Sequence, residues 1–92
     1  MNRGQFELEN VDKSILKKEM LRPKTNLRQE RLIREYSTSY MAKLIGLSNR
    51  RQYEQKERGR APFHDYEMMI ISQKFLMSIN YLFFDDMEPL DS

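Results

Sequence analysis

Side chains rich in hydrogen-bond donors gather between residues 49 and 60, where Tyr53 is the single aromatic residue. An Arg guanidinium donates two hydrogen bonds to O6 and N7 of guanine, and an Asn or Gln amide bridges N6 and N7 of adenine. Such side chains near the start of a polar helix predict contacts with base edges in the DNA major groove. A solvated surface is the simpler alternative for the arginines. The predicted base-reading residues are Asn49, Arg50, Arg51, Gln52 and Gln55.

The outward face of this expected helix follows from Tyr53, taken as its buried anchor. At about 100° per residue, Arg51, Gln55 and Arg58 face away from the core, and Glu57 lies nearer to it. Hydroxyl and cationic side chains around this face are predicted to contact phosphates, which position a protein on DNA without reading its sequence. The arginines at the helix end also suit the negative pole of the helix dipole. The predicted phosphate contacts are Thr38, Tyr40, Lys43, Ser48, Arg58 and Arg60.

Charge is divided unevenly along the 92 residues, although the net charge is only +2. Residues 1–21 are neutral, with four basic and four acidic side chains. Residues 22–60 carry eleven Lys or Arg against four Glu, for +7, and residues 61–92 carry one Lys against six acids, for −5. Chance clustering is the simpler explanation, but a basic block of this size favours a local surface for a polyanion.

The elements that must position these side chains are expected to be helices. Three Gly and three Pro interrupt the chain, and no stretch shows the β-branched alternation of strands. Asn26, Ser37 and Ser48 are predicted N-caps, and Gly46 suits a left-handed helix end. The expected helices cover residues 11–21, 26–36, 38–45, 49–58, 64–75 and a short segment capped by Ser78.

Two of these helices form a helix-turn-helix pattern, with only Gly46, Leu47 and Ser48 between them. The first has an apolar face made by Met41, Leu44 and Ile45, whereas the second is almost wholly polar. A polar helix gains little from packing, so binding in a DNA groove gives a reason for its sequence.

The composition also excludes several classes of function. A chain of this length fits one small domain. Without Cys there is no disulfide, thiolate nucleophile or Cys-based zinc site, and His64 stands without a second His or a triad partner. We therefore expect no enzyme, no cofactor and no metal ion. No apolar run approaches the roughly 18 residues of a membrane span, and the start lacks a signal-peptide pattern, so a cytoplasmic protein is expected.

Four segments resemble the Xre/Cro family of phage and bacterial regulators. They read AKLIGLS (42–48), KERGRAPF (56–63), ISQKF (71–75) and SINYLFF (78–84). The resemblance implies an all-α, five-helix domain like that of Cro and lambda repressor, preceded by an N-terminal extension, and a homodimer on a palindromic operator. It also implies that Arg31 and Glu57 form a structural pair beneath the recognition helix. Thr38 departs from the family, which often has Gln there.

These observations divide the chain into an N-terminal arm (1–25), a helix-turn-helix domain (26–84) and an acidic tail (85–92). The expected function is sequence-specific binding of double-stranded DNA by a transcriptional regulator, a repressor by default, with a recognition helix at about 49–58. The alternative is an adaptor or inhibitor with this fold that binds protein, through residues 1–25 or an exposed Phe84, or one that binds RNA.

Overall fold

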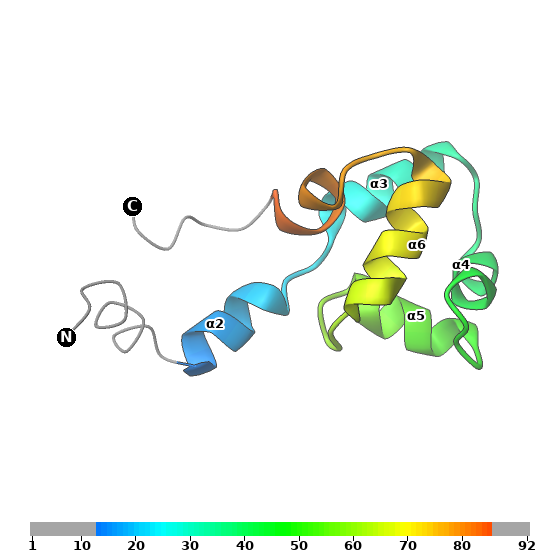
Figure 1. Cartoon of the computed structure of the whole chain (residues 1–92). Helices are drawn as coiled ribbons and strands as arrows, with labels where there is room; N and C mark the ends of the chain where they lie inside the picture. Colours follow the sequence, from blue (N-terminus) through cyan, green and yellow to red (C-terminus); the bar gives the residue numbers. More distant parts are fainter. Residues whose placement is uncertain (1–12, 86–92) are drawn as a thin grey trace.

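The structure is a computed structural model that describes residues 13–85. Every regular element among these residues is helical, which confirms the expected all-α class (Figure 1). Residues 1–12 of the expected arm and residues 86–92 of the expected acidic tail lie outside the described residues. The elements are α2 (Lys13–Met20), α3 (Thr25–Ile33), α4 (Thr38–Leu44), α5 (Arg50–Glu57), α6 (Asp65–Phe75) and a π-helical turn, η1 (Asn80–Phe84).

One cluster of buried side chains joins the elements from α3 to η1. Its centre consists of Leu27, Met41, Tyr53, Ile71 and Leu82, one from each of the five elements. The sequence predicted two of them, Met41 on an apolar helix face and Tyr53 as a buried anchor. Burial of each large apolar side chain contributes about 1.5–3 kcal/mol, so this cluster holds the five short elements together.

The last turn corrects a prediction about its two phenylalanines. Ser78 Oγ accepts a hydrogen bond from the Tyr81 backbone N–H at 3.1 Å, as expected for the cap. Phe83 is buried and packs edge-on against Phe63, with ring centroids 5.0 Å apart. Phe84 is half-buried and packs on the same cluster. The expectation of an exposed Phe84 was therefore wrong, because both rings of this wider π-helical turn lie against the core.

The bounds of α3 differ from those predicted. The helix begins at Thr25, and Asn26, predicted as its N-cap, lies inside the first turn. Asn26 Nδ2 instead donates a hydrogen bond to the Tyr81 carbonyl at 2.9 Å, which ties α3 to η1. The helix ends at Ile33, before the predicted end near residue 36, and Glu35 just beyond it has a left-handed φ of 58°.

Helices α4 and α5 follow each other through a tight turn, as the sequence predicts. Ser37 Oγ accepts from the Tyr40 backbone N–H at 3.0 Å, which confirms the first cap, and Gly46 has the expected positive φ of 81°. The predicted cap at Ser48 was wrong by one residue. Asn49 caps α5, and its Oδ1 accepts from the Gln52 backbone N–H at 3.0 Å.

Helix α2 lies apart from the other helices (Figure 1). It falls within the predicted range of 11–21. Its apolar side chains Ile15 and Met20 are 52% and 43% exposed. The segment after α2 is nevertheless attached to the body, because the Lys24 backbone N–H donates to the Glu57 carbonyl at 2.9 Å.

Candidate nucleic-acid interface

Burial of Tyr53 sets the rotation of α5 about its own axis. The Tyr53 side chain is fully buried, whereas Arg51 is exposed and Gln55 is half-buried. A helix rooted in this way turns its other side to solvent. An open hollow of about 550 Å³ lies on that outer side, lined by Asn49, Arg50, Arg51, Glu54, Gln55, Arg58 and Arg60. The structure thus brings together four of the five predicted base-reading residues.

The fifth, Gln52, takes part in the start of the helix instead. Gln52 Oε1 accepts a hydrogen bond from the Ser48 backbone N–H at 2.8 Å, while Asn49 Oδ1 accepts from the Gln52 backbone N–H. The two amide side chains satisfy donors that a helix start leaves open. An amide that bridges adenine uses its oxygen as acceptor and its nitrogen as donor. Each amide keeps its two N–H donors and a second lone pair on its oxygen, so base reading by Asn49 and Gln52 stays a prediction beside their role at the cap.

A buried carboxylate anchors α5 to α3. Glu57 accepts two hydrogen bonds from Arg31, at 2.8 Å from Nε and 3.0 Å from Nη2, and a third from the Tyr53 hydroxyl at 2.7 Å. All three side chains are buried, so the pair expected from the family resemblance is present. The hydrogen bond to Glu57 raises the pKa of Arg31, and burial raises the pKa of Tyr53 well above its usual value. Arg31 thus stays charged and Tyr53 stays a donor.

Thr38 does not lie free for a phosphate. Its Oγ1 donates a hydrogen bond to Glu54 Oε2 at 2.6 Å, which links the start of α4 to the middle of α5. This hydrogen bond, and then the nearby charges of Arg50 and Arg58, lower the pKa of Glu54. The Arg50 Nε lies 4.0 Å from the same carboxylate oxygen. Thr38 therefore orients an acidic side chain of the exposed face, a contact that the sequence did not suggest.

The other predicted phosphate contacts lie on the surface. Lys43, Ser48, Arg58 and Arg60 are exposed around the α4–α5 pair. Tyr40 is partly exposed, and the Lys74 ammonium lies 5.8 Å from the centre of its ring. Among the described residues, the side chains of Lys43, Ser48 and Arg60 form no hydrogen bond or ion pair, so they remain open to a ligand.

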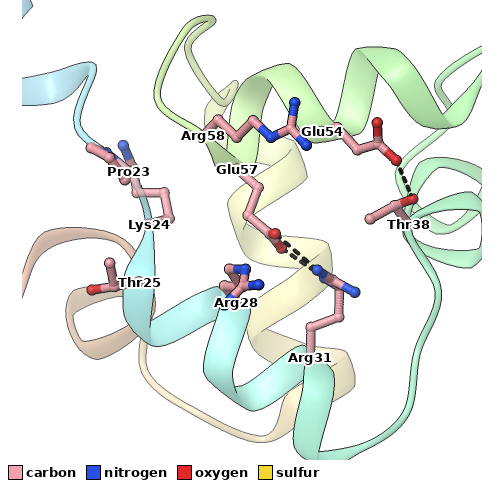
Figure 2. A pocket seen from close by; sticks show the side chains of 9 residues that line it. All are labelled: Pro23, Lys24, Thr25, Arg28, Arg31, Thr38, Glu54, Glu57 and Arg58. Atoms are coloured by element: carbon pink, nitrogen blue, oxygen red, sulfur yellow. Dashed lines mark hydrogen bonds and ion pairs between the residues drawn. The ribbon is translucent and has the colours of Figure 1, made fainter.

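A second, smaller hollow of about 200 Å³ lies between the start of α3 and the end of α5 (Figure 2). Arg28 and Arg58 both line it. Dashed lines in Figure 2 join Arg31 to Glu57 and Thr38 to Glu54, and none reaches Arg28 or Arg58. Both acids of this hollow, Glu54 and Glu57, thus accept hydrogen bonds, whereas the guanidinium groups of Arg28 and Arg58 donate none to the residues that the structure describes.

Arg28 and Glu54 are site residues that sequence reasoning missed. Arg28 lies more than twenty positions before α5, and only the packing of α3 against α5 brings it beside Arg58. The sequence feature that pointed to Arg28 was its position within the basic segment 22–60. Glu54 lies within the predicted recognition helix, but it was not among the predicted contacts.

Comparison with family models, curated proteins and solved structures found no match to this chain. Among residues 13–85 there is no group of three His, Asp or Glu side chains arranged to hold a metal ion. A search of the same residues for a helix long and apolar enough to cross a membrane also found none.

Proposed function

We propose that this protein is a sequence-specific DNA-binding regulator of the Xre/Cro type, with α5 as its recognition helix. The observation that carries the proposal is the hollow on the outer side of α5, where Arg50, Arg51 and Gln55 gather on a helix rooted by Tyr53. These side chains have the donors that guanine and adenine accept in the major groove. Residues with no structural task inside the fold are thus available to read bases.

Cations beside α5 support the proposal because phosphate contacts hold such a helix in its groove. Arg58 lines both hollows, so the recognition face continues into the smaller hollow and toward Arg28. Arg60 lines the large hollow as well, and Lys43 is an exposed cation of the neighbouring helix α4. Neutralising several phosphates releases counterions, and the affinity must then fall steeply as salt concentration rises.

Dimerisation and repression are further parts of this proposal. Two copies would place two α5 helices in successive major grooves, about one helical turn apart on a palindromic site. Exposed apolar side chains at the ends of α3 and α6, Ile33 in the last turn of α3 and Leu76 directly after α6, offer surface that a second copy would cover. Occupation of a promoter by such a dimer blocks transcription by occlusion.

Helix α2 favours a second candidate function, that of an adaptor that binds another protein. Ile15 and Met20 lie on a helix apart from the core, and their exposure leaves an apolar surface without a described cover. Such surfaces often bind partners. This candidate function is compatible with DNA binding, because the two functions use different helices, α2 and α5.

Selection from random DNA duplexes tests the main proposal. We expect the full-length protein to enrich one motif, and we expect its affinity for that motif to fall by orders of magnitude between about 50 and 200 mM salt. The selected duplex with its order of bases scrambled is the control. Enrichment of no motif, or an affinity that salt leaves unchanged, would contradict the proposal.

A further inference from the structure

An acidic side chain lies in the middle of the basic face of α5. Glu54 lines the large hollow with Arg50 and Arg51, and it also lines the small hollow with Arg58. Its side chain is 23% exposed, whereas Glu57, three residues further along the same helix, is buried. Among described residues of α5, it is the acid that faces the proposed DNA surface.

Neighbouring side chains among the described residues hold one of the two carboxylate oxygens of Glu54, namely Oε2. Thr38 Oγ1 donates to Glu54 Oε2 at 2.6 Å, and the Arg50 guanidinium lies near the same oxygen. The hydrogen bonds among the described residues leave Oε1 without a donor. An ionised carboxylate accepts about four hydrogen bonds, so Glu54 retains acceptor capacity toward the hollow.

A carboxylate beside DNA is repelled by phosphates unless it meets a donor. Within the major groove, guanine presents two acceptors, thymine presents O4 and a methyl group, and adenine presents one acceptor beside its donor. Cytosine presents the N4 amino group and no acceptor. An acceptor-only side chain therefore finds its best complement at cytosine and is repelled most strongly at guanine.

We propose that Glu54, oriented by Thr38, selects a cytosine at one position of the operator by accepting a hydrogen bond from its N4 amino group. This inference rests on the proposed function and deepens it, because it assigns a base to one residue. Glu54 is then a specificity residue, and Thr38 is a positioning residue that acts through it. The same negative charge lowers affinity for sequences that lack the cytosine.

Three variants, compared with the wild-type protein in the random-duplex selection, test this inference. Glu54→Gln keeps the shape of the side chain and removes its charge, and Thr38→Val removes the positioning hydroxyl. Glu35→Gln neutralises an exposed acid beyond the end of α3 and serves as the matched control. Thermal unfolding of each variant accompanies the selection, so that a loss of fold is recognised.

We expect the wild-type motif to contain a cytosine favoured about tenfold or more at one position. Glu54→Gln should lose that preference, keep the rest of the motif and bind scrambled duplexes more tightly. Thr38→Val should weaken the same preference without tighter binding to scrambled duplexes, and Glu35→Gln should change neither. If Glu54→Gln selects the same motif as the wild-type protein, the inference about Glu54 is wrong while the proposed function stands. If the wild-type protein selects no motif, the proposed function itself is wrong.

Discussion

At the scale of single residues, the carboxylate of Glu57 joins two helices. It accepts hydrogen bonds from Arg31 and from the Tyr53 hydroxyl, and these join α3 to the buried side of α5. Both oxygens are used, and the side chains around them are buried. The orientation of the proposed recognition helix therefore depends on the Arg31–Glu57 ion pair, which is buried inside the fold.

Glu57→Gln should destabilise the protein by about 3 kcal/mol, because removal of one partner leaves the Arg31 charge buried and uncompensated. Urea unfolding at neutral pH measures this change. Glu54→Gln is the matched control, since it makes the same chemical change in the same helix at a partly exposed site. We expect a clearly smaller loss for the control, because solvent screens the partly exposed Glu54 carboxylate. Equal losses in the two variants would contradict the structural role of Glu57.

Residue types predicted part of this chemistry. The Arg31–Glu57 pair came from the family resemblance, and the burial of Tyr53 came from its position as the lone aromatic of a polar helix. The Thr38–Glu54 bond was not predictable, because it joins two helices through a distance that no sequence spacing encodes. Asn49 and Gln52 have the side chains of base readers, yet the cap of α5 uses their oxygens.

At the scale of elements, two glycines with the same backbone angle have different surroundings. Gly46, after α4, and Gly59, after α5, both have a φ of 81°. A Cβ on Gly46 would meet no atom within 4 Å, whereas a Cβ on Gly59 would lie 2.4 Å from the carbonyl carbon of Arg22. The end of α5 thus packs directly on the segment that leads into α3.

Gly46→Ala should cost about 1–2 kcal/mol, the strain of a left-handed conformation for a residue with a Cβ. Gly59→Ala should cost clearly more, because the backbone around Arg22 must also move. Denaturant unfolding of the two variants compares these effects directly. A Gly59 variant no less stable than the Gly46 variant would show that this close approach is absent in solution.

Element types were more predictable than element ends. The predicted helical ranges overlap all the helices among residues 13–85, and Ser37 and Gly46 marked real boundaries. The predicted start of α5 was one residue too early, because Ser48 and Asn49 are both good N-caps and only the fold decides between them. The end of α3 depends on Glu35 in a left-handed conformation, for which the sequence offers no Gly.

At the scale of the whole molecule, the fold turns a basic sequence block into a basic surface. Arg28 on α3 and Arg58 at the C-cap of α5 lie thirty residues apart in the chain but line one hollow beside the proposed recognition face. The charge partition predicted that such a surface exists. It could not predict the contribution of α3, because that contribution requires α3 and α5 to pack together.

The central claim is that the outer face of α5 reads DNA sequence, and one variant tests it most directly. Arg51→Ala combined with Gln55→Ala removes two proposed base contacts from side chains that are not fully buried, so we expect an unchanged thermal midpoint. The measurement is the ratio of affinities for the selected and scrambled duplexes at about 0.15 M salt. We expect this ratio to fall by about a hundredfold or more, since each base contact contributes roughly 1–3 kcal/mol of discrimination. A folded double variant that keeps the wild-type ratio would contradict the account.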